Sequence, residues 1–245
     1  MALELPTGVI DFLQALGINF PEVNEDHVRE LGSQVREFAS NVDDTHQQAT
    51  GTITQMGQSY QGSSYEALVQ NWGSMSSQHM TELQDACSVV ATAMDVAADY
   101  IVGQKVAAIA ELVAMAVAFA ADQVAAVLTF GIAEAAMALI EAGARELCEV
   151  LEQQLTQYVV GKVIEAAINP LVDTVGRAVS GFAFQAAESA LGGGASGGGS
   201  GGGSGSFMMQ PAELTAQART MLTHADTMQQ HADTFASNVS ALTFT

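Results

Sequence analysis

A run of glycine and serine divides this chain of 245 residues into two unequal parts. Residues 192–206 read GGGASGGGSGGGSGS and contain no side chain large enough to pack, so they cannot offset their own ordering entropy. We expect a flexible coil with a reach of roughly 20 Å, enough to join two neighbouring helix ends. Residues 1–191 are long enough to bury a core, whereas residues 207–245 have to pack against them. So regular a repeat favours an engineered linker between two natural sequences.

The composition of both parts predicts an all-α fold. The chain has only four prolines, and Ala, Leu, Val, Met, Glu and Gln dominate outside the Gly/Ser run. Aromatic residues make up 6%, and β-branched runs with a period of two do not appear in the sequence. We predict an elongated helical hairpin or bundle, extended by Ala-rich apolar helices, with the helix after the linker packed on it.

The charge balance argues against several classes of function. Lys and Arg total 7 against 27 Asp and Glu, and the formal charge of -20 repels nucleic acid and anionic lipid headgroups. Cys87 and Cys148 lie in helix-like apolar patterns without a CxxC pair, which predicts buried thiols. The sequence also has no Gly-rich phosphate loop after a strand and no G-x-S-x-G elbow. We therefore expect no enzymatic activity, no metal site and no cofactor.

The sequence predicts a short helix near its start and a long helix after it. Thr7 is placed to cap a short helix that stops at Gly17, and Pro21 then breaks the chain. Asn24 is placed to cap a long helix. The apolar seam of the long helix alternates spacings of three and four, as in a coiled coil, and comprises Val28, Leu31, Val35, Phe38, Val42, Thr45, Ala49, Thr52 and Met56.

This seam ends at Tyr60-Gln61-Gly62, where Gly62 can adopt the positive φ of a tight turn. Ser63 and Glu66 then form an S-x-x-E capping box that starts a second long helix. Because the turn is so short, the two helices have to form an antiparallel hairpin. The apolar stripe of the second helix comprises Leu68, Trp72, Met75, Met80, Leu83, Cys87, Val90, Met94, Ala97 and Ile101.

Residues 106–140 are apolar nearly all round, which is typical of a helix that is buried or in lipid. The pattern predicts one helix to about Thr129, a break at Phe130-Gly131, and a second helix to Ile168 that Asn169-Pro170 ends. A last helix is expected over residues 171–191.

Two environments are open to this apolar block. Residues 112–132 span 21 positions with Asp122 as the one charge, which is long enough to cross a bilayer. A charge near the middle of a span costs on the order of 3 kcal/mol, and no basic flank fixes a topology. We therefore favour the buried core of a helical bundle. The alternative is a membrane-inserting helical pore or translocation domain.

The clearest periodicity follows the linker. Pro211 suits a first helical position and Glu213 the first turn. Nine apolar residues occupy heptad a and d positions: Leu214, Met221, Met228, Phe235 and Leu242, with Ala218, Ala225, Ala232 and Val239. His224 and His231 lie beside this seam about 10 Å apart, too far to share a metal, and we expect them to be solvated flank positions.

A lone helix of this length is only marginally stable in water, so the seam after the linker needs partner helices. We expect it to face residues of the hairpin, namely Val28, Leu31, Val35, Phe38, Val42, Leu68, Met75 and Leu83. The chain then divides into a short N-terminal helix (1–20), a helical hairpin (21–102), an Ala-rich bundle (103–191), the linker (192–206) and a fused partner helix (207–245).

The hairpin turn carries a family resemblance. Tyr60-x-Gly62, followed by Ser64, Ala67 and Trp72, resembles the W-x-G motif of the WXG100 family of small hairpin proteins, which bacterial type VII secretion exports. Tyr60 stands where the family has Trp, and Trp72 matches the downstream helical aromatic. The three residues Tyr60, Gly62 and Trp72 either form a recognition feature for the secretion machinery or only shape the turn and close the bundle end.

The order of segments extends the resemblance over residues 1–190. LPTGVIDFLQALGINFP, the acidic capped helix, the Y-x-G turn, the Ala-rich helices and the FGIAEAA break are similar to the WXG100-like N-terminal domain of actinobacterial type VII toxins. The founding member of that group is described as an outer-membrane channel protein carrying a necrotizing toxin. Residues 209–245 resemble the first helix of an ordinary WXG100 protein.

The resemblance implies that the hairpin and a small WXG100-like partner form an antiparallel bundle, which the type VII secretion ATPase recognises as one folded substrate. Further small helical partners are compatible with it. It also implies export by type VII secretion from the cytoplasm, consistent with a start, MALELPTGVIDFLQALG, that does not read as a Sec-type signal. The family's Y-x-x-x-[DE] export signal is absent from this sequence.

Overall fold

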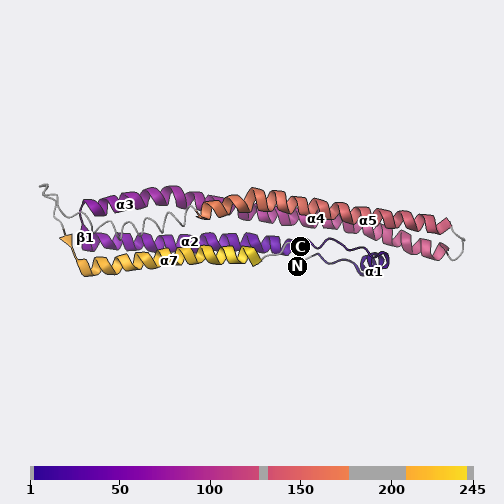
Figure 1. Ribbon diagram of the computed structural model, residues 1–245, viewed down its shortest axis with the longest axis horizontal. Coiled ribbons are helices and arrows are strands. Elements are labelled where there is room, and N and C mark those ends of the chain that lie inside the picture. Colours follow the sequence, from indigo (N-terminus) through magenta and orange to yellow (C-terminus); the bar gives the residue numbers. More distant parts are fainter. Residues whose placement is uncertain (1–2, 127–131, 177–207, 242–245) are drawn as a thin grey trace. The chain divides into compact units, whose positions relative to one another are not determined.

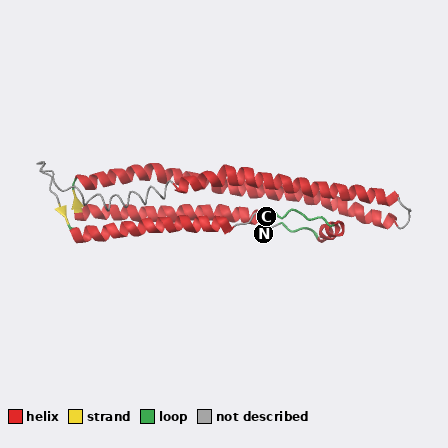
Figure 2. Ribbon diagram, in the orientation of Figure 1, coloured by secondary structure: helices red, strands yellow, loops and turns green. Residues whose placement is uncertain are grey.

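The computed structural model describes residues 3–126, 132–176 and 208–241, which are almost entirely helical (Figures 1 and 2). The helices are α1 (Thr7–Leu16), α2 (Glu25–Ser59), α3 (Ser63–Met75), α4 (Thr81–Ala126), α5 (Ile132–Tyr158) and α7 (Pro211–Ala241), with π-helical segments η1 (Ser76–Met80) and η2 (Val159–Ile168). Residues 169–176 are also helical. Two short strands, β1 (Tyr60–Gln61) and β2 (Met208–Met209), pair antiparallel.

The all-α prediction is therefore confirmed. Three predicted features lie outside the described residues: the break at Phe130-Gly131, most of the helix over 171–191, and the linker over 192–206.

The described residues fall into two compact units. The first contains residues 3–32, 92–126 and 132–168, and the second contains residues 33–91 with the described parts of 169–241. Helices α2 and α4 each contribute one part of their length to each unit.

Helix α1 is held in the first unit by its apolar face. Val9, Phe12 and Leu13 are buried, and the Phe12 ring meets Phe119 edge to face with 5.4 Å between the ring centroids. They belong to a cluster with Ile18, Leu112, Ala144 and Cys148, drawn from α4, α5 and the segment after α1. Helix α1 and the segment after it thus pack on the Ala-rich helices.

The ends of α1 and α2 show which caps the sequence predicts well. Gly17 ends α1 as expected, with a φ of 65° in the left-handed region. Asn24 caps α2 as expected, because its Oδ1 accepts the Asp26 amide at 2.9 Å. The prediction for Thr7 was wrong: Thr7 is the first helical residue, and no side chain caps α1. The carbonyl of Pro6 accepts the amides of Val9 and Ile10 at 2.9 and 3.1 Å.

A buried ion pair joins α2 to α4 within the first unit. Lys105 Nζ donates to Glu25 Oε2 at 2.7 Å, and the Leu3 amide donates to Glu25 Oε1. The side chains of Lys105 and Glu25 are only 6% and 1% exposed. Burial alone would raise the pKa of Glu25, but the hydrogen bonds from Lys105 and Leu3 outweigh it, so the pKa lies below its usual value.

Helices α4 and α5 form an antiparallel hairpin in the first unit, with Tyr100 stacked on Tyr158 at a centroid distance of 4.1 Å. The prediction that this apolar block is the buried core of a helical bundle was wrong for its described residues. Among residues 106–123 only Ala108 and Leu112 are buried. Three valines are at least 40% exposed: Val106, Val113 and Val117 at 50%, 40% and 66%. Two helices bury only the stripes that face each other, so the remaining apolar faces stay open.

The α2–α3 turn forms as predicted at Gly62. Its φ of 152° with ψ of 174° lies in a region that is essentially restricted to glycine. The predicted capping box was wrong: α3 begins at Ser63, and no side chain caps it. The Gly62 carbonyl accepts the amides of Tyr65 and Glu66 at 3.0 and 3.2 Å.

Contacts between α2 and the following helix confirm the antiparallel hairpin. In the second unit, Tyr65 Oη donates to the Ile53 carbonyl at 3.2 Å, and Gln84 Nε2 donates to the Ala39 carbonyl at 2.8 Å. Residues later in the second arm therefore contact residues earlier in α2, as in an antiparallel pair of helices.

The second arm of the hairpin is not one α-helix, although its pattern predicts one. The buried residues Met75 and Met80 are five positions apart instead of three or four, and η1 covers this step. Val163 and Ile168, within η2, repeat the five-residue step. A π-helical turn takes in one additional residue, so the apolar stripe stays on the same face.

The prediction that Asn169-Pro170 ends a helix was wrong, because residues 169–176 continue the helical backbone after η2. Proline normally breaks an α-helix since its ring clashes with the carbonyl four residues earlier. The wider π-helical turns that precede Pro170 relieve this clash.

Candidate partner-binding interface

One predicted contact is that between α2 and α7 in the second unit (Figure 1). Phe38 and Phe235 stack with a centroid distance of 4.8 Å and an interplanar angle of 26°. Both are buried, and so is Met228 one heptad earlier on α7. The heptad pattern therefore directs the apolar face of α7 against α2.

The remaining predicted seam residues of α7 are half-buried, and residues between them are mostly exposed. The half-buried set comprises Leu214, Ala218, Met221, Ala225, Ala232 and Val239. Leu242 lies outside the described residues. The second unit thus contains an amphipathic α7 whose buried stripe follows the predicted positions.

The hairpin residues predicted to face α7 divide between the two units. In the second unit Val35, Phe38, Val42, Met75 and Leu83 are buried and Leu68 is half-buried. Val28 and Leu31 are also buried, but they belong to the first unit.

The two histidines of α7 are part of the seam, so their prediction as solvated flank residues was wrong. His224 Nε2 and His231 Nε2 lie 3.2 Å from Thr52 Oγ1 and Thr45 Oγ1, respectively. Both histidines are half-buried, and both threonines are buried. Burial lowers the pKa of His224. The heptad pattern alone assigned these histidines to a flank because it does not weigh polar partners on the facing helix.

A strand pair that the sequence did not indicate closes one end of the α2–α7 contact. Tyr60 pairs with Met209 and Gln61 with Met208, and the Gln210 amide donates to the Ser59 carbonyl at 2.9 Å. Two-residue strands leave no periodic signal, so only the short non-helical gaps before α3 and α7 could have suggested them.

The predicted tip residues lie at the α2–α3 end of the second unit. Tyr60 is half-buried in β1, and Gly62 forms the turn. Trp72 stacks on His46 with a centroid distance of 5.1 Å, and its Nε1 donates to Thr50 Oγ1 at 2.9 Å. Trp72 therefore braces α3 against α2, and its recognition role remains a prediction.

His46, the residue beneath Trp72, is tied to both arms of the hairpin. Its Nε2 lies 2.8 Å from Ser76 Oγ. Burial lowers the pKa of His46, and the nearby Asp43 carboxylate opposes this effect.

One concave feature of the second unit is very small. A cavity of about 20 Å³ lies between α2, α3 and α7, lined by Thr45, Ala49, Trp72, Met221, His224, Ala225 and Met228. This volume accommodates about one water molecule and no organic ligand. The cavity is a packing gap within the helical interface.

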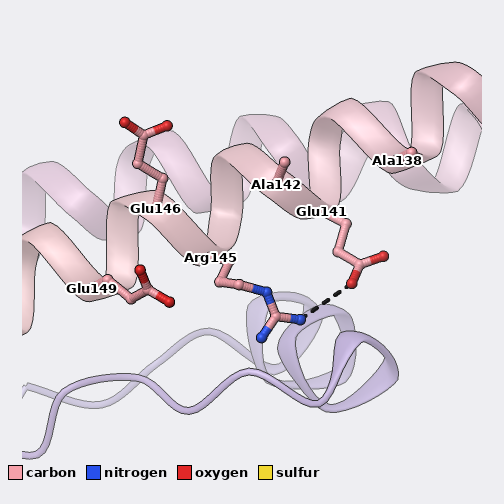
Figure 3. A pocket seen from close by; sticks show the side chains of 6 residues that line it. All are labelled: Ala138, Glu141, Ala142, Arg145, Glu146 and Glu149. Atoms are coloured by element: carbon pink, nitrogen blue, oxygen red, sulfur yellow. Dashed lines mark hydrogen bonds and ion pairs between the residues drawn. The ribbon is translucent and has the colours of Figure 1, made fainter.

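A second concave feature is an open surface of α5 (Figure 3). Arg145 donates to Glu141 at 3.2 Å, while Glu146 and Glu149 project from the same helix without reaching that pair. All lining residues come from one helix, so the surface has no opposing wall. In the described ranges, no group of three or more His, Cys, Asp or Glu is placed to hold a metal ion.

The cysteines are buried as predicted, at 1% exposure for Cys87 and 4% for Cys148. Burial raises the pKa of Cys87 to about 11 and also raises the pKa of Cys148. Both thiols are therefore protonated and unreactive near neutral pH.

Comparison with known proteins identifies one family. The model of the WXG100 like domain matches residues 4–146, which include α1, α2, the Y-x-G turn and α3. No curated protein and no solved structure matches the chain. The family match covers more than half of the 245 residues and contains the hairpin that α7 contacts. The chain therefore belongs to the WXG100-like domain family of helical proteins related to type VII secretion.

Proposed function

We propose that this chain is a non-enzymatic targeting and heterodimerisation domain of a type VII-secreted toxin, joined to the helix of a small WXG100-like partner. In this proposal residues 1–191 are the toxin leader, and residues 207–245 take the place of a partner that is normally a separate protein. The single observation that carries the proposal is the docking of α7 along α2. Family membership supports the link to type VII secretion.

The character of the α2–α7 contact favours recognition between two chains. Stacked phenylalanines, Phe38 and Phe235, form its apolar part, and three side-chain hydrogen bonds accompany them. Desolvated aromatic anchors of this kind dominate the energetics of protein interfaces. The Gly/Ser composition of residues 192–206 also suits an artificial connection between two chains that find their own geometry.

The toxin assignment rests on the order of segments over residues 1–190, which is similar to toxin N-terminal domains. A leader of this type needs no catalytic residues, because the secretion ATPase recognises the surface of the folded bundle. Export as a folded pair would also account for the absence of a Y-x-x-x-[DE] signal in this sequence, because a partner can supply the signal for both chains.

Cleavage of the linker tests the partner assignment. A protease site inserted near residue 197 allows the chain to be cut after folding, and the products are then run by size exclusion at micromolar concentration. We expect residues 207–245 to co-elute with the larger fragment. Elution of the small fragment alone, with the thermal midpoint of the larger fragment unchanged, would contradict the proposal.

A matched pair of variants shows whether co-elution depends on the seam. Phe235→Ala removes a buried ring and should release the cleaved segment at a concentration at which the unmodified segment stays bound. Thr234→Ala changes an exposed neighbour on the same helix and should leave the elution profile unchanged.

Export is tested in a bacterium that carries a type VII system. Because this sequence has no Y-x-x-x-[DE] signal, such a segment is appended after residue 245. The tagged chain with α7 present should then reach the culture medium when the secretion ATPase is intact and stay in the cells when the ATPase is inactivated. Equal release in both strains would argue against the targeting role, even if the cleaved segment co-elutes.

A second candidate function is a membrane-inserting pore or translocation domain. Among the described residues, the Thr81–Gln123 part of α4 is the one helix long and apolar enough to cross a membrane, with a mean hydropathy of 1.7 and 22% of the measured window buried. The side chains of Val106, Val113 and Val117 are exposed and could contact lipid acyl chains. The docked α7 has no role in this alternative.

Vesicle flotation separates the two functions. Neutral phosphatidylcholine vesicles are mixed with the protein at pH 7.4 and at pH 5.0, and leakage of a trapped dye is recorded in parallel. The docking function predicts no flotation and no leakage at either pH. Clear flotation with leakage would favour the pore.

A further inference from the structure

Three hydroxyl side chains lie buried on the face of α2 that meets α7. Thr45, Thr52 and Ser59 are seven residues apart, and their exposed fractions are 4%, 8% and 3%. A spacing of seven places them on one stripe, roughly 10 Å from one to the next. We call these three residues the hydroxyl ladder.

Each member of the hydroxyl ladder has one partner on α7. Thr45 Oγ1 lies 3.2 Å from His231 Nε2, and Thr52 Oγ1 lies 3.2 Å from His224 Nε2. Ser59 Oγ donates to Glu213 Oε2 at 2.7 Å. The order of partners is reversed along α7, as the antiparallel arrangement requires.

The direction of these bonds is fixed by the backbone of α2. Thr45 donates its only hydroxyl hydrogen to the Asn41 carbonyl at 3.0 Å, and Thr52 donates to the Gln48 carbonyl at 3.1 Å. A hydroxyl has one hydrogen to give, so each threonine can only accept from α7. His224 and His231 therefore present Nε2–H, whereas Ser59 donates to a carboxylate.

An apolar seam alone discriminates weakly between amphipathic helices, because apolar residues repeat at the a and d positions of every coiled coil. A buried hydroxyl does distinguish them. A facing side chain that offers the correct donor or acceptor forms a hydrogen bond, and one that does not leaves a buried polar group unsatisfied. Polar residues at seam positions are known to select partners in this way at some cost in stability.

We infer that the hydroxyl ladder is a partner-selection code, in which α2 accepts at Thr45 and Thr52 and donates at Ser59. The helix that fits it carries a carboxylate, then a hydrogen-bond donor eleven residues later and a second donor seven residues after that, as Glu213, His224 and His231 do. This inference rests on the proposed function, since it treats α7 as a docked partner helix. It adds the chemistry by which the docking surface rejects other apolar heptad helices.

The code predicts that the effect of one substitution at the Thr52–His224 pair changes sign when the threonine is replaced. In the intact chain, His224→Leu should lower the folding equilibrium constant about tenfold, because Thr52 loses its donor. In a T52V background the same substitution should raise the constant, because an apolar pair then replaces an unpaired histidine. Urea unfolding followed by circular dichroism at pH 7.5 gives the four values of the cycle.

The chemistry of the donor is tested at the same position. His224→Gln keeps an N–H and should stay within about twofold of the unmodified chain, whereas His224→Glu offers only acceptors and should lose tenfold or more. Thr223→Glu adds the same charge at an exposed neighbouring position, so it measures the effect of charge alone.

Two outcomes overturn the inference. One is a coupling of less than twofold between T52V and H224L. The other is an equal loss for His224→Gln and His224→Glu after correction by Thr223→Glu. If T52V fails to fold, the cycle of T45V with H231L measures the other rung. Release of α7 from the unmodified chain after linker cleavage would instead contradict the proposed function. The coupling between T52V and H224L is measured in the uncleaved chain, so it does not depend on that result.

Discussion

Glu25 and Lys105 are the charged residues that the described part of the chain buries, and each depends on the other. A carboxylate at 1% exposure loses most of its hydration, and the Lys105 ammonium at 2.7 Å and the Leu3 amide replace it. The bond to Leu3 also fixes the segment that precedes α1. One residue thus connects the start of the chain, α2 and α4 in the first unit.

Removing one member of this pair should cost much more than removing both. Glu25→Gln leaves the Lys105 charge buried without a counter-ion, and we expect a loss of about 3 kcal/mol in the free energy of unfolding. Glu25→Leu combined with Lys105→Met should recover most of that loss. Urea denaturation at pH 7 measures both, with Glu111→Gln on the exposed side of α4 as the control. A loss for the double variant as large as for the single one would contradict this account.

The pair also gives an acid limit to stability. The pKa of Glu25 is lower in the folded chain than its usual value near 4.5. The stability that it contributes is therefore complete above that value and is lost as the pH falls through the folded pKa.

Gly62 is the residue whose backbone conformation no other side chain fits well. With φ at 152° and ψ at 174°, a Cβ would be strained, so Gly62→Ala should lower the free energy of unfolding by about 1–3 kcal/mol. Gly51 lies in the middle of α2 with open space around it, and Gly51→Ala should stabilise the chain by up to about 1 kcal/mol. Thermal unfolding of the two variants, measured side by side, tests the contrast; equal effects would argue against a strained turn.

At the scale of elements, hydrophobic periodicity predicted the helices correctly. It did not predict the two π-helical segments. The seams of α2 and α7 and the hairpin at Gly62 follow from apolar spacing and one glycine. The steps of five at Met80 and Ile168 were visible in the spacing, but a π-helical turn is rare enough that a continuous α-helix was the natural expectation.

The candidate interface was predictable in its apolar part and not in its polar part. Phe235 and Met228 follow the heptad and are buried. His224 and His231 lie one step off the a and d positions, and only the facing Thr52 and Thr45 make burial of an imidazole tolerable. Such matching depends on which two helices meet, which a single helix pattern does not contain.

Docking of α7 should weaken in mild acid because of His224. Burial places its pKa in the folded chain below the usual 6.5, so the unfolded chain binds more protons in this range. The contribution of His224 is therefore complete above pH 6.5 and falls as the pH drops through the folded pKa. Burial also lowers the pKa of His46, which packs against Trp72 and Ser76, so the hairpin loses stability in the same direction as the pH falls.

Denaturant midpoints at pH 7.5 and pH 5.5 should show this loss, and His224→Gln should make the difference smaller. His79→Gln changes an exposed histidine in η1 and should leave the difference as it is. An unchanged pH dependence in His224→Gln would assign the effect to other groups.

At the scale of the whole molecule, the imbalance of 27 acidic against 7 basic residues opposes compactness in both units. Few cations are available to pair, and the ion pairs on the surface, such as Arg145 with Glu141, have side chains nearly half exposed. Exposed pairs of this kind contribute little. The sum of like charges at -20 therefore outweighs them, and the folded chain repels itself.

Added salt should consequently raise the stability of this protein. Increasing NaCl from 20 to 500 mM shortens the screening length from about 20 Å to about 4 Å, which removes most of the repulsion between exposed carboxylates and little of the attraction in the buried Glu25–Lys105 pair. We expect an increase of about 1 kcal/mol, or roughly 2–4 °C in the thermal midpoint for a chain of this size. Potassium chloride should raise the thermal midpoint by the same amount. Sucrose at the same osmolality carries no charge and should not reproduce this increase. A midpoint that falls with salt would mean that the exposed ion pairs, despite their small number, govern the electrostatics of the fold.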